Sequence, residues 1–265
     1  MHRNLTVVRL FVKKIYLILL VLMCTCLGCE WRLRSDLRPE SDLFIERYDR
    51  TEAFFLTTGD FSALQQMQTH YPMQTRRLIE DVLQLGKVDD EHINIRFLSF
   101  FQDSTLQALI SEVGRQYDDM SDIDQSLRES FERFSQLFPN AETPIVYTQI
   151  GSLDQSIVVG DSLLGISLDK YLGADFPLYV KYGYSERQRS MMTREYIVPD
   201  CLVFYLLSLY PAPSDSLHEV HMGRIQYSVN SMLKQQFFKS PYVEQARQQM
   251  DENKGLSFPE LLEGE

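Results

Sequence analysis

Two histidines three residues apart, His218 and His221, are the side chains whose spacing best fits metal chemistry. Residues three apart lie on one face of a helix, so both imidazoles could reach a single ion. The segment reads His-Glu-x-His, however, and not the His-Glu-x-x-His of zinc peptidases. The histidines His70 and His92 are distant in the sequence, and no third ligand is evident nearby. We therefore expect a solvated helix start here and no metal site.

Four aspartates gather near an expected helix junction, at Asp118, Asp119, Asp122 and Asp124. Calcium takes about six to eight oxygen ligands, and the EF-hand spacing that would supply them is absent. Helix capping and solvation account for the cluster instead. The sequence also lacks a G-x-S-x-G elbow, a phosphate-binding loop and a dinucleotide fingerprint. It therefore predicts no catalytic residue, no cofactor site and no metal site.

Cys29 follows a segment with the pattern of an export signal. Four basic residues precede an almost unbroken apolar run over residues 15–27, which is shorter than the roughly 20 residues that a membrane-spanning helix needs. The run ends in Gly28-Cys29, which resembles the lipobox of bacterial lipoproteins, where the thiol receives a diacylglycerol and the chain is cut before the cysteine. The pattern predicts a lipoprotein signal peptide over residues 1–28 and lipidation of Cys29. The alternative is an ordinary secretory signal with a chance cysteine.

The charge balance limits the partners of the processed chain. From Cys29 onward it holds 22 basic and 37 acidic residues, a net charge of −15. This balance does not fit nucleic-acid binding or a polybasic grip on anionic lipid, so membrane attachment would depend on the lipid. Residues 29–41 are polar and irregular and are expected to form a flexible tether. Cys201 lies in an apolar run, where we expect a buried, unreactive thiol.

Residues 42–265 are long and apolar enough to form one globular domain. Cap residues and apolar spacings predict helices in the front half, alternation predicts short strands in the middle, and helices follow. This order predicts an α+β class, a mainly helical single domain with a small central β-sheet. The expected strands are 43–48, 144–150, 156–159 and 163–168, and the expected helices are 60–69, 75–85, 105–118, 121–138, 187–209 (perturbed at Pro199), 218–238 and 242–253.

Five aromatic residues crowd one loop-like stretch that also holds glycines and a proline. Tyrosine combines a large apolar area with a hydrogen-bonding tip, which suits recognition surfaces. The stretch is therefore a candidate partner surface. The alternative is that these rings fill the core beneath the sheet. The five residues are Tyr171, Phe176, Tyr179, Tyr182 and Tyr184.

Residues 164–179 (LGISLDKYLGADFPLY) resemble the central signature of the GldB family of gliding-motility lipoproteins. Residues 196–200 and 223–227 are similar to two further blocks of that family, and residues 44–49 and 144–151 fit the same order. The resemblance covers most of the chain after Cys29, and the lipobox agrees with it. Residues 242–253 match only loosely and lack the tryptophan that is usual in the family.

The resemblance implies a cell-envelope lipoprotein required for gliding, with no established catalytic activity. The family is distantly similar to predicted zincin-type peptidase domains, so a degenerate zincin-like fold is expected. The corresponding helix would lie around Arg194, Glu195 and Val198. Glu195 could stand in for the general base, but Arg194 and Val198 occupy the ligand positions and neither binds zinc. The implied site is inactive.

We therefore expect a non-enzymatic, lipid-anchored component of gliding or allied protein-secretion machinery that acts through contacts with other envelope proteins. Its expected place is the outer membrane, facing the periplasm. One alternative is a lipid-anchored metallohydrolase whose zinc site lies outside the expected helix. Another is a surface lipoprotein that binds a glycan or another ligand through the stretch from Tyr171 to Tyr184.

Overall fold

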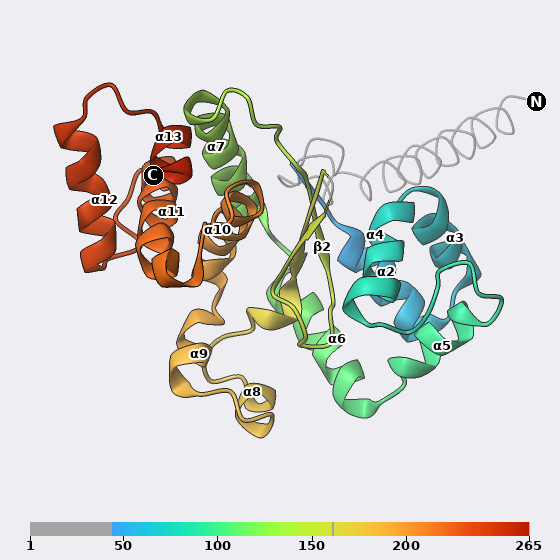
Figure 1. Ribbon diagram of the computed structural model, residues 1–265. Helices are drawn as coiled ribbons and strands as arrows, with labels where there is room; N and C mark the ends of the chain where they lie inside the picture. The colour runs from blue at the N-terminus through green and yellow to red at the C-terminus, as the bar shows by residue number, and fades with distance from the viewer. Residues whose placement is uncertain (1–43, 161, 265) are drawn as a thin grey trace, which may run out of the picture. The chain divides into compact units, whose positions relative to one another are not determined.

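A four-stranded mixed sheet lies between two groups of helices in the structure, a computed structural model that describes residues 44–160 and 162–264 (Figure 1). The strand order is β1-β2-β4-β3, in which β1, β2 and β4 run parallel and β3 pairs antiparallel with β4. The strands are β1 (Ile45–Glu46), β2 (Ile145–Gln149), β3 (Ile157–Gly160) and β4 (Leu163–Ser167).

The centre of the sheet depends on a glycine. Tyr147 of β2 pairs with Gly165 of β4, and the Tyr147 ring lies 2.6 Å from the point that a Cβ on Gly165 would occupy. Any side chain at this position would collide with the ring, so the sheet requires glycine there. Strands β3 and β4, which match the strands expected over 156–159 and 163–168, pair antiparallel as a hairpin, and residue 161 between them lies outside the described part of the chain.

The first helix replaces part of a predicted strand. The strand expected over 43–48 is confirmed only as β1, because α2 (Tyr48–Thr58) already begins at Tyr48. The buried residues of α2 include Tyr48, Glu52, Phe55 and Leu56, which follow helical spacing. Because the polar Glu52 lies within this buried stripe, the apolar pattern of the sequence did not indicate a helix here. The helix ends at Gly59, whose φ of 69° lets its N–H reach the Phe55 carbonyl.

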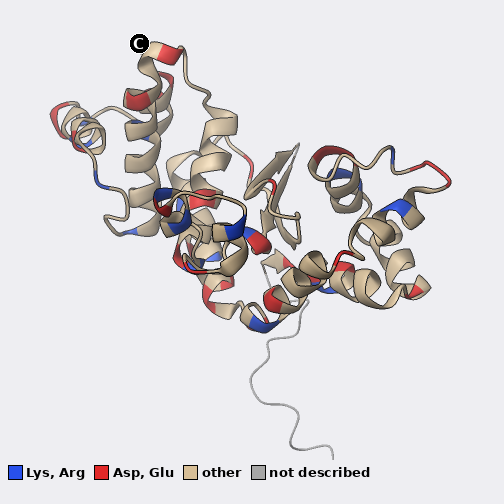
Figure 2. Ribbon diagram, turned by 90° about the horizontal axis from the view of Figure 1, so that it is seen from below, with Lys and Arg blue, Asp and Glu red and all other residues tan. Residues whose placement is uncertain are grey.

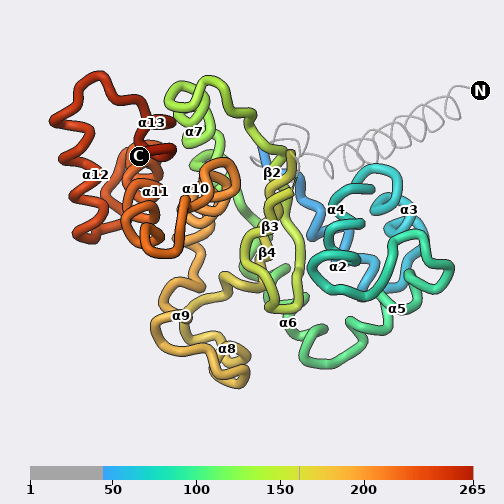
Figure 3. The backbone as a smooth tube through the Cα atoms, in the orientation of Figure 1, coloured from blue at the N-terminus to red at the C-terminus, as the bar shows by residue number. Residues whose placement is uncertain are grey.

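Helices α2 to α5 lie on one side of the sheet, and α2 contacts β2 directly (Figure 3). Asp60 and Asp103 cap the next helices through their carboxylates, as predicted, because each accepts two backbone N–H groups. The segment expected as one helix over 75–85 is instead a short α-helix that passes into a π-helical turn. The elements are α3 (Phe61–Thr69), α4 (Pro72–Arg77), the π-helical turn η2 (Leu78–Val82), α5 (Ile93–Phe100) and α6 (Ser104–Gln116).

The second group of helices lies on the other side of the sheet, where α10 contacts β3 and β4 (Figure 3). Pro199 is the third residue of α10, where its missing N–H is not needed, so it opens the helix without a kink. The long helix expected over 187–209 is divided into α9, η4 and α10. The members of this group are α7 (Ser121–Leu137), α10 (Ile197–Leu209), α11 (His218–Leu233), α12 (Pro241–Glu252) and α13 (Phe258–Glu263).

Short elements link the sheet to this group. They are the 3-10 turns η3 (Leu168–Lys170), η4 (Arg194–Tyr196) and η5 (Asp215–Leu217), with α8 (Pro177–Lys181) and α9 (Glu186–Met191) between them. The predicted α+β class, mainly helical with a small central sheet, is confirmed. Cys201 is fully buried in α10, as expected, and burial raises the pKa of its thiol well above the usual range.

Phe44–Glu265 forms one compact unit. Within residues 44–160 and 162–264, none of the helices has the length and hydrophobicity required to cross a membrane. The signal peptide, Cys29 and the tether predicted over 29–41 lie outside the described residues.

Candidate functional site

A groove of about 800 Å³ opens beyond the carboxyl end of β2. Four parts of the chain form its walls: residues 82–84 at the end of η2, the turn after β2, the segment from the end of α5 to the start of α6, and the end of α8 with the residues that follow it. Apolar side chains such as Leu83, Phe100 and Leu106 alternate with polar ones that include Asp154, Lys181 and Tyr182. A concave site with apolar walls and a few polar groups is the usual form of a binding site.

Three residues of the groove have left-handed backbone conformations. Their φ values are 51° at Gln84, 52° at Ser152 and 67° at Leu153. Such angles are uncommon for residues with a side chain, and they persist only where surrounding contacts enforce them. Strained backbone of this kind clusters at binding and switch sites, which marks the groove as a candidate functional site.

A buried carboxylate holds the turn after β2 in this conformation. Asp169 of η3 accepts the N–H of Gly151 at 2.7 Å and the N–H of Leu153 at 2.5 Å. Its side chain is fully buried, and desolvation raises the pKa of Asp169, while these two N–H groups partly offset the rise. The turn therefore depends on a contact between residues 16 and 18 positions apart in the chain.

Lys170 and Tyr184 fasten the other side of the turn. Both Lys170 Nζ and the Tyr184 hydroxyl donate to the Leu153 carbonyl, at 3.2 and 2.8 Å. Lys170 Nζ also lies 3.0 Å from the Tyr184 hydroxyl and 4.6 Å from the centre of its ring. This arrangement combines hydrogen bonds with a cation–π contact and fixes Tyr184 as a wall of the groove.

The five aromatic residues proposed as a partner surface divide into two sets. Tyr171 and Tyr179 are buried, so they belong to the core as in the alternative interpretation, and they are unable to contact a partner. The Tyr171 hydroxyl donates to the Asp200 carboxylate. Burial raises the pKa of Asp200 to about 7. Phe176 is half-buried against Tyr179. Tyr182, which is 55% exposed, and the half-buried Tyr184 line the groove.

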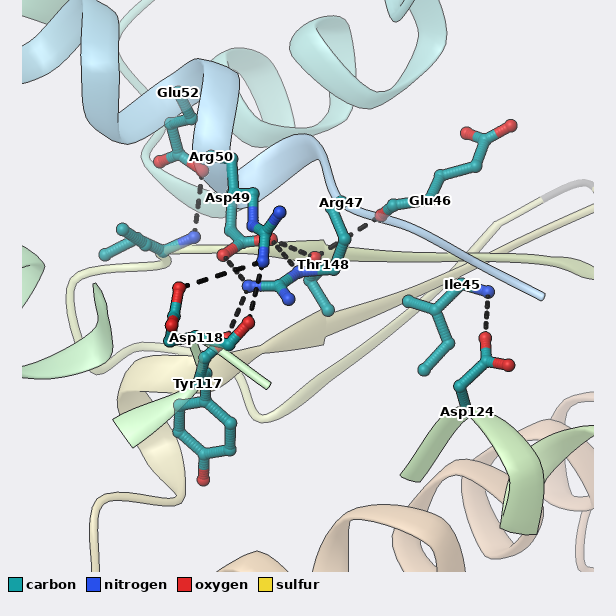
Figure 4. Close-up of polar contacts among 11 residues, drawn as sticks. Ile45, Glu46, Arg47, Asp49, Arg50, Glu52, Tyr117, Asp118, Asp124 and Thr148 are labelled. Carbon is teal, nitrogen blue, oxygen red and sulfur yellow. Dashed lines mark hydrogen bonds and ion pairs between the residues drawn. The ribbon is translucent and has the colours of Figure 1, made fainter. Parts of the chain in front are cut away.

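A second polar cluster closes the β1 edge of the sheet (Figure 4). Arg47 donates from Nε and Nη2 to the two carboxylate oxygens of Asp49, at 2.8 and 2.9 Å, and Nη2 also donates to the Tyr117 carbonyl at 2.7 Å. The Thr148 hydroxyl donates to the same carboxylate. The side chains of Arg47 and Asp49 are only 4% and 5% exposed. A shallower groove of about 480 Å³ lies above this ion pair, but the pair's hydrogen-bonding groups are already engaged.

Glu52 lies one turn further along α2 and has a different environment. One carboxyl oxygen, Oε2, accepts the N–H of Ile150 at 2.9 Å, and Oε1 has no hydrogen-bond partner in the structure. Its side chain is fully buried, and desolvation raises the pKa of Glu52 well above the usual range, with smaller contributions from Asp49 and Asp169. Glu52 therefore holds the end of β2 through the Ile150 N–H, and its burial favours the protonated form of the carboxyl.

The other chemical candidates from the sequence serve the fold. His218 is exposed as predicted, but the expected solvation of His221 was wrong, because its ring is buried and Nε2 lies 2.7 Å from the Tyr210 carbonyl. Asp119 accepts the N–H of Ser121 at the start of α7. Asp124 accepts the N–H of Ile45 and so ties α7 to β1. Among residues 44–160 and 162–264, no three acidic, histidine or cysteine side chains are grouped to hold a metal ion.

Arg194 joins the acidic cluster to the start of α10. Its guanidinium donates to both carboxylate oxygens of Asp122, at 3.1 and 2.6 Å, and to the carbonyls of Gln116 and Asp119. This bidentate bond lowers the pKa of Asp122, with burial opposing it. Val198, the other position implied by the zincin resemblance, is buried in α10. Arg194 therefore joins the segment before α10 to the start of α7 and the residues that precede it, and Val198 is part of the buried core.

Sequence reasoning identified Tyr182 and Tyr184 of the groove, but it missed Asp169, Glu52 and the pair Arg47–Asp49. The strand predicted over 43–48 included Arg47 and ended before Asp49, and neither residue was given a role. A signal was available, because charged residues with i, i+2 spacing directly after a strand can form a bidentate pair.

The chain was compared with known proteins. No curated protein and no solved structure shows significant similarity to it. The model of one family, described as gliding motility protein GldB, matches residues 31–263, which is nearly the whole chain. This extent agrees with the resemblance carried by residues 164–179, 196–200 and 223–227, and the match also spans the tail over 242–253. The chain belongs to the GldB family of gliding motility proteins.

Proposed function

We propose that the protein is a lipid-anchored, non-catalytic component of the envelope machinery for gliding or allied protein secretion. The observation that carries this proposal is the family match over residues 31–263, which begins just after the lipobox-like Gly28-Cys29. Two independent features of one chain, an export signal that ends in cysteine and a gliding-motility domain, thus agree.

Cys29 supplies the anchor in this proposal. Each buried methylene contributes about 0.8 kcal/mol to membrane binding, so two or three acyl chains attach a protein stably, whereas one does not. The processed chain is acidic, which leaves the lipid as the attachment to an anionic bilayer. We place the protein in the outer membrane, facing the periplasm, because the tether after Cys29 lacks the acidic run that resembles a surface-export tag.

The arrangement around Arg194 supports a non-catalytic role. Its guanidinium is bonded to Asp122 and two backbone carbonyls, at a position where the zincin resemblance would require a zinc ligand. The positive charge would also repel a cation. The alternative, a metallohydrolase with its site elsewhere, predicts one equivalent of zinc in the purified protein, which is lost in the His218→Ala variant. Our proposal predicts no stoichiometric zinc.

The groove beyond β2 is the proposed contact site for a partner protein. Tyr182 supplies an exposed aromatic ring, and the Asp169 and Lys170 contacts hold the adjacent wall rigid, so a partner would bind with little loss of conformational freedom. The alternative that this stretch binds a glycan is favoured by the same exposed tyrosine, and a glycan array with wild type and Tyr182→Ala would test it.

The proposal is tested by crosslinking in intact envelopes followed by affinity purification of the wild type, Tyr182→Ala and Val180→Ala. Val180 is a matched control, because it is 56% exposed on the same short helix and does not line the groove. We expect the same envelope proteins with the wild type and Val180→Ala, and at least about tenfold less of them with Tyr182→Ala, as for a central aromatic of an interface. Equal recovery from all three would contradict the groove as the contact site.

A further inference from the structure

One segment of the surface is free of exposed charge, although 24% of the chain is charged. Residues 53–75 form the end of α2, all of α3 and the start of α4, and thirteen of these residues are exposed. None of the thirteen is Lys, Arg, Asp or Glu. The one charged residue of the segment, Asp60, is half-buried and caps α3. Figure 2 marks where acidic and basic residues lie along the ribbon. Exposure to solvent therefore does not explain why these thirteen residues include no charged side chain.

Large apolar side chains protrude from the same region. Phe61 is 76% exposed, Met73 52% and Phe54 51%. Ile95 of α5, which is 67% exposed, lies one helical turn before Leu98, whose Cδ2 is 3.6 Å from the Cβ position of Gly59 in the α2–α3 turn. We call residues 53–75 together with Ile95 the Phe61 face. The exposed arginines Arg50, Arg76 and Arg96 border these residues along the chain, and apolar patches with a polar rim mark interaction surfaces.

The rest of the unit from Phe44 onward has the opposite character. Outside residues 53–75, the unit holds 19 basic and 32 acidic residues, a net charge of −13. Helix α12 illustrates it, since Arg247 pairs with Glu244 and Asp251 on an exposed charged surface. Anionic lipid headgroups repel such a surface within about one Debye length, roughly 8–10 Å. An uncharged face can approach an anionic bilayer without this repulsion.

The length of chain between Cys29 and Phe44 limits how far the unit can lie from the membrane. The 15 residues from Cys29 to Phe44 span at most about 50 Å when fully extended. A compact unit of 222 residues has a radius of gyration of about 17 Å. Much of the surface of the unit can therefore reach the bilayer, and surface chemistry decides which part does. The tether also gives the unit a high effective concentration at the surface, so a weak intrinsic affinity suffices.

We propose that the Phe61 face rests on the lipid bilayer to which the N-terminal lipid fastens the chain. This inference depends on the proposed lipid anchor. Phe61 and Ile95 insert at the level of the headgroups and the first acyl carbons, where aromatic and aliphatic side chains are favourable. Exposed glutamine and threonine side chains of α3 bond to the headgroups around them. The groove beyond β2 is then held at a fixed height above the membrane for its partner.

The test uses the lipidated processed protein in phosphatidylethanolamine/phosphatidylglycerol vesicles, with ordinary or brominated acyl chains. Trp31 is the one tryptophan of the chain, so Trp31→Phe gives a silent background into which Phe61→Trp or Tyr182→Trp is introduced. Both sites are well exposed, at 76% and 55%, and tolerate a larger ring. We expect brominated lipid to reduce the emission of Phe61→Trp roughly twofold, as for a side chain at the acyl boundary, and to leave Tyr182→Trp unchanged.

Other outcomes overturn the inference and are separable from failure of the anchor. If vesicles float with the protein and Phe61→Trp is not quenched by brominated lipid, the anchor stands and the Phe61 face does not touch the bilayer. If this tryptophan is instead shielded from acrylamide as protein density rises, a second copy occupies the face. Loss of the protein from the vesicles would contradict the anchor itself. A further variant, Phe61→Lys, should abolish the quenching of a tryptophan placed at Ile95.

Discussion

Two neighbouring regions along β2 bury acidic side chains in different ways. At the β1 edge, Asp49 is neutralised by the equally buried Arg47 and also bonded by Thr148. At the turn after β2, Glu52 and Asp169 receive mainly backbone N–H groups, and burial raises the pKa of both. The first region therefore depends on an intact ion pair, whereas the raised pKa values of Glu52 and Asp169 predict that the stability of the second region, which adjoins the groove, depends on pH.

The largest effect is expected from breaking the ion pair. Arg47→Ala leaves the Asp49 carboxylate buried without its cation, and loss of one partner of a buried pair costs about 3–5 kcal/mol. We predict this loss in the free energy of unfolding of the processed protein, measured by urea denaturation followed by circular dichroism. Arg50→Ala is the control, because that side chain is 46% exposed and its ion pair with Asp118 should contribute less than about 1 kcal/mol. Equal losses in the two variants would contradict the distinction.

The next largest effect is expected at Asp169. Asp169→Ala leaves two buried N–H groups without acceptors, each of which costs about 1–3 kcal/mol. Because the variant also removes the desolvation cost of the buried carboxyl, which offsets part of this sum, we predict a total loss of about 2–4 kcal/mol. Faster hydrogen exchange at Gly151 and Leu153 should accompany it. Asp154→Ala, an exposed neighbour in the same groove, should change stability by less than about 0.5 kcal/mol. Unchanged exchange at both amides in Asp169→Ala would show that the turn is held by other contacts.

Glu52→Gln should alter the pH dependence of stability. Because the folded-state pKa of Glu52 is raised, the folded chain binds the proton more tightly than the unfolded chain. Its contribution is therefore fully present below the unfolded pKa, near 4.5, and is lost as pH rises above it, by roughly 1.4 kcal/mol per pH unit until the folded form ionises. The variant lacks this loss, so its stability relative to wild type should increase from pH 4 to pH 8. The free energies of unfolding of both proteins are measured by urea denaturation at these pH values. If they change with pH in parallel, the raised pKa of Glu52 is contradicted.

The smallest effect is expected from Tyr184→Phe. The variant keeps the ring beside Lys170 but removes the hydroxyl that donates to the Leu153 carbonyl, a loss of about 1 kcal/mol. Tyr182→Phe, which alters an exposed hydroxyl in the same groove, should be neutral within about 0.5 kcal/mol. A larger loss in Tyr182→Phe than in Tyr184→Phe would reverse the roles assigned to the two tyrosines.

Local patterns predicted much of the fold. The caps Asp60 and Asp103 and the strands around 145–149 and 163–167 follow from neighbouring residues, so they could be read directly. No helix was predicted over the range of α2 (Tyr48–Thr58), because Glu52 interrupts its apolar stripe.

The buried polar contacts of the candidate site could not be read in the same way. Thr148 bonds Asp49 across 99 positions, and Ile150 bonds Glu52 across 98. No local pattern indicates such partners, and only the sheet brings them together. Tyr182 was found because exposed aromatics near glycines are visible in sequence, whereas the buried positions of Tyr171 and Tyr179 depend on the packing of the whole domain.

Attachment through Cys29 is the feature on which the proposed function depends most directly. Cells that express the wild type or Cys29→Ser should be labelled with an alkyne analogue of palmitate and separated into soluble and membrane fractions. We predict that the wild type carries the label and sediments with membranes, and that Cys29→Ser carries none and is either soluble or retained as the uncut precursor. Equal labelling of the two proteins, or a soluble unlabelled wild type, would contradict a lipid anchor at Cys29.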